Sequence, residues 1–254
     1  MNAVPQKLEF KISHTNQICK IHKEHMINVH GRIVCQSCVE KIMKQSNEKY
    51  ESDKNIRILN LKMVRAGIPK RHVNSGFSNY AVTHKGQDKA RKTCEKFTMD
   101  FNSGVFRNLL LVGRTGTGKT HLGSSILKNI IIKNWEAIYI TSADLAEDIA
   151  GAYRRSGDSE DEALKRYVKK DLLIIDEYGL HDRAEKRPQL LESVHKVLLT
   201  RYDELKPTVV ISNLSLSEVR EDLGDRLWSR FQHDGLDIVE CDWDDARIGG
   251  GKAQ

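Results

Sequence analysis

The chain has 254 residues, of which 39% are hydrophobic and 30% charged, and its formal net charge is +6. This length allows one or two domains with a sizeable core, and the composition fits a soluble globular protein. Apolar runs fall far short of the ~20 residues that a membrane helix needs. The first 13 residues, MNAVPQKLEFKIS, lack the apolar core of a signal peptide. We therefore expect a cytoplasmic protein.

The positive charge is concentrated in the first third of the chain. Residues 1–75 hold 14 Lys/Arg and 6 Asp/Glu, a net charge of +8, whereas the remainder holds 27 and 29, a net charge of −2. This asymmetry favours a partner that is a polyanion or an acidic protein surface. The alternative is a basic segment that is merely solvated.

Three of the five cysteines lie near the N-terminus, and their spacing predicts a metal site. Cys19 and His22 form a C-x-x-H pair, and Cys35 and Cys38 form a C-x-x-C pair. Two such pairs are typical of tetrahedral zinc, and four protein ligands make the site structural rather than catalytic. Bound Zn²⁺ would supply folding energy that so short a stretch cannot obtain from a core.

The spacing leaves the fourth zinc ligand open, because His25 and His30 are near enough to replace His22. The alternative to zinc is a small helical cap whose cysteines are reduced and unligated. We assign residues 1–45 to a zinc-binding N-terminal module.

A helical connector and linker are expected over residues 46–75. The sequence from 39 to 66 is polar and helix-prone, without Pro or Gly, and apolar side chains recur at helical spacing, at Ile56, Leu59, Met63 and Ala66. Gly67 and Pro69 stop the helix. We expect its apolar face to pack against a second domain that spans residues 76–254.

A phosphate-binding loop follows the apolar run at residues 107–112. The loop consists of Gly113, Arg114, Thr115, Gly116, Thr117, Gly118, Lys119 and Thr120. Its glycines let backbone N–H groups converge on phosphate. Lys119 would reach the β- and γ-phosphates, and Thr120 would coordinate Mg²⁺. The helix that begins at Lys119 places its positive end at the anion.

Residues 171–177, DLLIIDE, predict a second buried strand with two acids at its carboxyl end. Asp176 would hold the Mg²⁺ shell, as the acid of a phosphate-loop site does. Glu177 is suited to act as general base or to orient water. The adjacent pair therefore favours hydrolysis over transfer of phosphate to a small molecule.

Apolar runs at 137–141 and 207–213 predict two more strands, and helical segments are expected near 119–134, 143–155 and 187–205. This alternation predicts a mostly parallel sheet covered by helices. Asn213 stands at a strand's carboxyl end, where ligands bind in such sheets. It could reach the γ-phosphate or the attacking water, although Asn at a strand end is also a common turn residue.

Two arginines, Arg226 and Arg230, are four residues apart and would share a helix face. An arginine can stabilise transition-state charge on phosphate, in cis or from a neighbouring subunit. An ion pair with Asp225 or another acid is the alternative.

Residues 153–170 are a candidate surface for single-stranded DNA. Six basic side chains lie there, at Arg154, Arg155, Lys165, Arg166, Lys169 and Lys170. Tyr153 or Tyr167 could stack on bases. The stretch also contains GDSEDE, so a solvated, salt-bridged pair of helices is an equal alternative.

Together these elements resemble the AAA+ ATPases of the initiator and helicase-loader group, and more narrowly the DnaC/IstB family. DnaC-type loaders of replicative helicases, including phage versions, and IstB-type transposition helpers are closely similar. The resemblance covers roughly residues 65–250. It rests on AGIPKRHVNSGFSNY, GRTGTGKTHL, LLIIDEYG, LLTRYDELKPTVVISNL and LGDRLWSRF followed by VECDWDDAR.

The resemblance implies an α/β AAA+ (P-loop) domain without a full lid, in which a parallel sheet is sandwiched by helices. Residues 113–120 match the Walker A loop, and Asp176 and Glu177 match the Walker B acids. Asn213 matches sensor 1, and Arg230 matches an arginine finger that acts on ATP in a neighbouring subunit, with Arg226 as a second candidate. Arg247 matches a sensor-2-like arginine.

A DnaC-like chain would be an ATPase that uses ATP, Mg²⁺ and Zn²⁺. It would bind the hexameric replicative helicase through its N-terminal region, contact single-stranded DNA and form an ATP-dependent homo-oligomer. An IstB-type transposase helper that binds duplex DNA is the alternative. A zinc-containing DNA-binding regulator that uses ATP only as a switch is the third hypothesis.

Overall fold

The computed structural model describes residues 12–155, 157–179 and 188–244. The chain divides into two compact units, Met1–Ile58 and Leu59–Gln254. No helix in the described ranges is long and apolar enough to cross a membrane.

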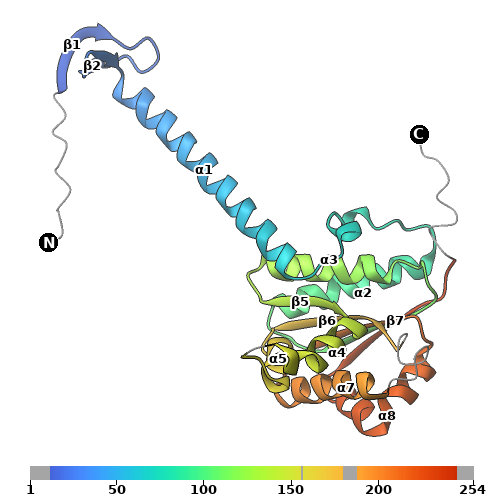
Figure 1. The fold of residues 1–254 in the computed structure, drawn as a ribbon. Helices are drawn as coiled ribbons and strands as arrows, with labels where there is room; N and C mark the ends of the chain where they lie inside the picture. The colour runs from blue at the N-terminus through green and yellow to red at the C-terminus, as the bar shows by residue number, and fades with distance from the viewer. Residues whose placement is uncertain (1–11, 156, 180–187, 245–254) are drawn as a thin grey trace. The chain divides into compact units, whose positions relative to one another are not determined.

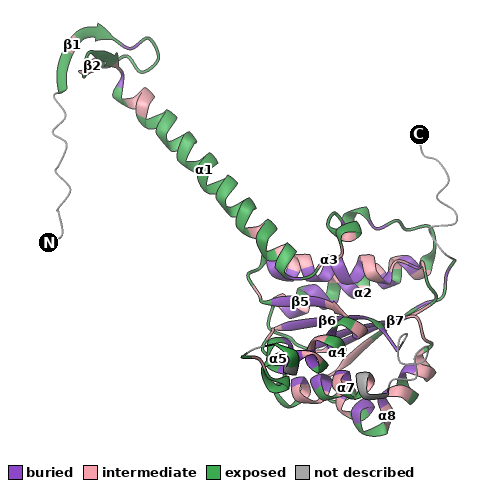
Figure 2. Ribbon diagram, viewed as in Figure 1, coloured by how far each residue is buried: buried purple, intermediate pink, exposed green. Residues whose placement is uncertain are grey.

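The first unit contains a small antiparallel sheet and most of a long helix. Strand β1 (Ile12–Ile18) pairs with β2 (His25–Val29), which pairs with β3 (Arg32–Val34). His30 and Gly31 both have positive φ, 52° and 83°, so they form the tight turn that joins β2 to β3. Helix α1 (Gln36–Arg65) follows and has no buried residue; in Figure 2 it is mostly green, with pink intermediate residues near its start.

The second unit is built on a five-stranded sheet in the order β5-β6-β7-β4-β8, and every neighbouring pair of strands is parallel. The strands are β4 (Asn108–Gly113), β5 (Ala137–Thr141), β6 (Leu172–Tyr178), β7 (Thr208–Ser212) and β8 (Leu236–Cys241). The α-helices of this unit that follow α1 are α2 (Lys85–Asn102), α3 (Lys119–Ile132), α4 (Ser142–Ala150), α5 (Glu160–Val168), α7 (Pro188–Asp203) and α8 (Leu216–His233). Short 3-10 turns lie at Lys70–His72, Phe77–Asn79 and Ala152–Arg154.

Successive residues of a strand point to opposite faces of the sheet, and here each face carries its own core. In β4, Leu109 and Leu111 join the core that includes residues of α2 and α3. Leu110 and Val112 join the core that includes residues of α4, α5, α7 and α8. Figure 1 shows these two helical layers on either side of the sheet. The predicted parallel sheet between helical layers is therefore confirmed.

The predicted strands at 107–112, 137–141, 171–177 and 207–213 correspond to β4 to β7, with ends displaced by at most one residue. Helix α4 ends at Ala150, before Gly151, so the helix expected over 143–155 is shorter than predicted. Strand β8 and helix α2 were not predicted.

The connector helix ends at Arg65, next to the predicted stop, and Gly67 follows with a φ of 76°. Leu59 and Met63 are partly buried and pack, with buried Ala66, into the core that contains α2 and α3. Ile56 is exposed.

Candidate nucleotide site and metal cluster

The phosphate loop connects β4 to α3 at the carboxyl edge of the sheet. All three of its glycines have positive φ, 123° at Gly113, 81° at Gly116 and 90° at Gly118. A Cβ atom at Gly113 would overlap with the backbone carbonyl of Cys241, so this position needs glycine for the close approach of β8. The predicted strand–loop–helix context of the motif is present.

Lys119 lies inside the curl of this loop and is buried, with 5% of its surface exposed. Its Nζ donates to the carbonyl oxygens of Gly113 and Arg114, at 2.6 and 2.7 Å. The ammonium group is therefore already placed at the centre of the loop, where it can meet a phosphate.

Thr120 and Asp176, the two predicted magnesium ligands, lie next to each other. The Thr120 hydroxyl donates to Asp176 Oδ2 at 2.9 Å, and the buried Tyr139 hydroxyl donates to the same oxygen. Burial and the Asp176 charge raise the pKa of Tyr139, so this phenol remains a donor. A hydroxyl and a carboxylate that share this space suit the shell of one Mg²⁺ ion.

Glu177 is exposed although its neighbours in β6 are buried. The register of β6 against β7 shifts between Ile175 and Tyr178, and Glu177 has a φ of 57°. A bulge of this kind redirects a side chain, and a non-glycine residue in left-handed backbone costs about 1–3 kcal/mol. The strained backbone therefore presents the second acid at the edge of the sheet, away from the core.

Asn213 directly follows β7, whose Ser212 is paired in register with Tyr178 of β6. Because β4, β6 and β7 are parallel neighbours, their carboxyl ends meet at one edge. This edge carries the phosphate loop, the two acids and Asn213.

Arg230 lies at the opposite edge of the sheet. The carbonyl of its neighbour Phe231 accepts a hydrogen bond from Asn108, the first residue of β4, at 2.9 Å. A strand of this length places that edge roughly 17 Å from the phosphate loop. The Arg230 guanidinium lies 5.5 Å from the centre of the Tyr202 ring. Arg226 is exposed one turn earlier in α8, and the prediction for Arg247 lies outside the described residues.

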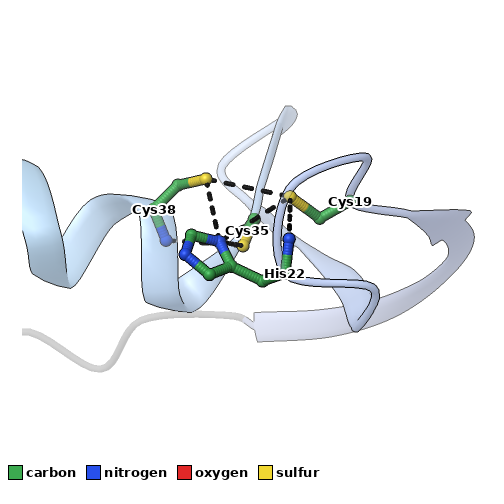
Figure 3. Close-up of side chains that lie close together, drawn as sticks. All are labelled: Cys19, His22, Cys35 and Cys38. Carbon is green, nitrogen blue, oxygen red and sulfur yellow. Dashed lines mark hydrogen bonds between the residues drawn. The ribbon is translucent and has the colours of Figure 1, made fainter.

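The predicted zinc ligands form a compact cluster in the first unit (Figure 3). The ligand atoms of Cys19, His22, Cys35 and Cys38 all lie within 4.8 Å of one another. Tetrahedral Zn²⁺ with Zn–S bonds of ~2.3 Å separates two sulfurs by ~3.8 Å. The Sγ atoms of Cys19 and Cys38 are 3.8 Å apart.

The histidine in this cluster is His22, through Nδ1. Its distances to the three sulfurs are 3.9 Å to Cys19, 3.4 Å to Cys35 and 3.3 Å to Cys38. These distances fit the ~3.5 Å between nitrogen and sulfur ligands of one tetrahedral zinc ion. The residues present therefore fit a Cys₃His zinc site.

The protein environment acts in opposite directions on two of the thiols. Hydrogen bonds from the backbone of His22 and Ile21 lower the pKa of Cys19 to about 6. Burial and the Glu24 carboxylate, which accepts from the Cys35 thiol at 2.9 Å, raise the pKa of Cys35 to about 12. Zinc would favour the thiolate form of every cysteine that it binds.

Most basic residues of the candidate DNA stretch form ion pairs. Arg155 and Arg166 both pair with Asp148 and Asp158. Lys165 pairs with Asp161, and Lys170 pairs with Glu136. Tyr167 is buried, with its hydroxyl on Asp148, so it is not available to stack on a base. These contacts favour the salt-bridged alternative for this stretch.

A family model described as IstB-like ATP binding protein matches residues 27–236. The chain belongs to the IstB-like ATP-binding family. The replicative helicase loader DnaC of Escherichia coli strain K12 is 28% identical over 183 residues, which cover 72% of this chain and 73% of DnaC. Protein YdaV of the same strain is 26% identical over 204 residues, 80% of each chain.

Solved structures agree with this family assignment. A crystal structure of the DnaC helicase loader has a TM-score of 0.58 at 25% identity and covers 68% of this chain and 99% of that chain. A structure of DnaI has a TM-score of 0.54 at 21% identity, covering 70% and 93%, and supports the fold alone. The predicted AAA+ fold and the predicted resemblance to the DnaC/IstB family are confirmed.

Sequence reasoning missed several side chains that contact the candidate nucleotide site of this IstB-like domain. Tyr139 holds Asp176 from the neighbouring strand, and Tyr80 and Trp243 both contact the phosphate loop. Tyr139 belongs to the predicted strand AIYIT, where a polar hydroxyl in an apolar run was the available signal. Tyr80 and Trp243 lie within the quoted family strings, but their spacing carries no information on what they touch.

Proposed function

We propose that this protein is an ATP-dependent loader of the replicative helicase in DNA replication. Its N-terminal region binds the hexameric helicase and helps to place it on single-stranded DNA, while ATP binding and hydrolysis time assembly or release. The observation that carries the helicase assignment is the similarity to DnaC, which extends over 73% of that loader.

The nucleotide site supports ATP hydrolysis. Lys119 binds the β- and γ-phosphates, and Thr120 with Asp176 holds Mg²⁺, which neutralises phosphate charge when bound. Glu177 orients or deprotonates the attacking water. Asn213 contacts the γ-phosphate or that water from the next strand. The 2.9 Å contact between Thr120 and Asp176 is the geometric basis for this assignment.

Arg230 supports a shared site between copies of the chain. An arginine side chain reaches ~7 Å, well short of the ~17 Å length of β4 that separates Arg230 from its own phosphate loop. Arg230 therefore acts on ATP bound to a neighbouring subunit, with Arg226 as the second candidate. The family resemblance gives Arg247 a sensor-2-like role. The active form is a homo-oligomer.

In this proposal Zn²⁺ stabilises the first unit through Cys19, His22, Cys35 and Cys38. Because these four protein ligands complete a tetrahedron, the ion has a structural role. The folded module then presents the helicase-binding surface.

The IstB-like family match favours one alternative, a transposase-helper ATPase that binds duplex DNA. A preference for duplex over single-stranded DNA, together with no contact to the helicase, would support it.

Two substitutions test the ATPase proposal. K119A should abolish ATP binding, because the buried ammonium is lost from the loop. E177Q should keep ATP affinity near that of the wild type but lower kcat by about 100-fold or more, because the water loses its base. Calorimetric ATP titration and phosphate release measure the two effects.

K133A is the matched control, since Lys133 is exposed at the other end of α3. It should bind and hydrolyse ATP like the wild type. Wild-type hydrolysis by E177Q, or wild-type affinity in K119A, would contradict the proposed roles.

A further inference from the structure

The carbonyl oxygen of Thr117, inside the phosphate loop, accepts hydrogen bonds from two aromatic side chains that are distant in sequence. The Tyr80 hydroxyl donates to it at 3.1 Å, and the Trp243 indole Nε1–H donates at 2.9 Å. Thr117 is 1% exposed, so water has little access. A carbonyl has two lone pairs, and these two donors occupy both.

The direction of this carbonyl fixes the direction of the next amide. In a trans peptide the C=O and the following N–H point in opposite directions. Because Tyr80 and Trp243 both bind the Thr117 carbonyl, the Gly118 N–H is turned away from these two side chains. Phosphate loops bind anions through backbone N–H groups, so the orientation of this amide matters for phosphate binding.

Close packing holds both aromatic rings in place. A Cβ atom at Gly118 would come within 2.7 Å of the Tyr80 ring, so the ring lies directly on the loop backbone. A Cβ at Gly86 would come within 2.9 Å of the Trp243 ring, which therefore lies directly on the first turn of α2.

Further contacts anchor the two segments that carry these rings. The segment before Tyr80 is bound to α3 by Lys128, which donates to the carbonyls of Val73 and Ser75, each at 2.7 Å. Trp243 follows β8 by two residues, and β8 pairs in register with β4 up to Gly113 and Cys241. Both donors thus come from segments tied to the elements that flank the loop.

We infer that Tyr80 and Trp243 are positioning residues for the phosphate loop. They come from near the two ends of the domain's sequence and hold the loop in the shape that binds phosphate. This inference rests on the proposed nucleotide site. When nucleotide occupies the loop, it changes the environment of the Trp243 N–H. Nucleotide binding is therefore sensed at the segment that follows β8.

Two conservative variants test this role. Y80F and W243F each keep an aromatic ring and remove one donor. Each should weaken binding of a non-hydrolysable ATP analogue with Mg²⁺ by about fivefold or more, the effect of one hydrogen bond of ~1 kcal/mol. The double variant should differ from the product of the single effects, because both donors serve one carbonyl. W135F, which changes a tryptophan that packs on Phe101 and Phe106, should bind normally.

A second measurement uses the full wild-type chain, so it does not depend on the folding of a variant. Each of the three tryptophans gives one indole N–H signal in an NMR spectrum. The analogue should shift the Trp243 signal and leave those of Trp135 and Trp228 in place. An unchanged Trp243 signal, or wild-type affinity in both single variants, would overturn the inference. If the wild type binds no nucleotide at all, the proposed function itself fails.

Discussion

Arg201 is the largest fully buried side chain in the described part of the chain. Its guanidinium donates to the carbonyls of Tyr167, Lys170 and Pro207 at 2.6–2.8 Å, and its Nε donates to the Thr208 hydroxyl at 2.9 Å. These contacts join the end of α5 and the α5–β6 loop to the turn before β7. Arg201, Pro207 and Thr208 of the string LLTRYDELKPTVVISNL therefore have a packing role in this structure.

R201A should lower the free energy of unfolding of the second unit by about 3 kcal/mol or more, because several buried carbonyls lose their donor. R166A removes an arginine from a partly exposed ion-pair network and should cost at most ~1 kcal/mol. Urea unfolding followed by tryptophan fluorescence reports on this unit, since Trp135, Trp228 and Trp243 all lie in it. Equal midpoints for the two variants would contradict the structural role of Arg201.

At the scale of elements, the local sequence pattern was sufficient to predict a strand wherever successive residues of that strand are buried. Strands β4, β6 and β7 are apolar runs buried on both faces, and the glycines and Lys119 of the phosphate loop fall in a fixed motif. The sequence therefore predicted four of the five strands of this sheet and the motif residues that the structure brings together at its carboxyl edge.

Two strands with mixed or high exposure, β1 and β8, were not predicted. Strand β1, ISHTNQI, is mostly exposed, and β8 alternates only partly between buried and exposed positions. Among the described residues of the first unit, Cys19 and Cys35 are the only buried hydrophobic ones, so apolar burial leaves no pattern there that would predict the small sheet. Tyr80 and Trp243 reach Thr117 across 37 and 126 residues, a separation at which no periodic pattern links them.

The metal cluster makes a prediction that distinguishes the three candidate histidines. Wild-type protein should carry about one zinc per chain, and H22A should lose most of it, because Nδ1 of His22 completes the tetrahedron. H25A and H30A are the matched controls and should retain zinc, since neither belongs to the cluster. Metal analysis after exhaustive dialysis measures the content. Retention in H22A combined with loss in H25A or H30A would refute the assignment of His22.

At the scale of the whole molecule, the excess positive charge and the proposed nucleotide-binding residues lie in different parts of the chain. The net charge of residues 1–75 is +8, whereas the residues proposed to bind and hydrolyse ATP lie between Gly113 and Arg247. This division fits a protein in which one region recognises an acidic partner surface and another uses nucleotide to time the contact.

Co-elution of the full chain with the hexameric replicative helicase of the organism that encodes it tests the central claim most directly. Size-exclusion chromatography of zinc-loaded wild type with the helicase, with and without ATP, should give a stable complex whose formation or release depends on ATP. The C35S/C38S variant should lose the complex while it still binds ATP, because the zinc ligands lie outside the nucleotide-binding unit. A folded, zinc-loaded wild type that never co-elutes with the helicase but binds duplex DNA with ATP would contradict the loader account.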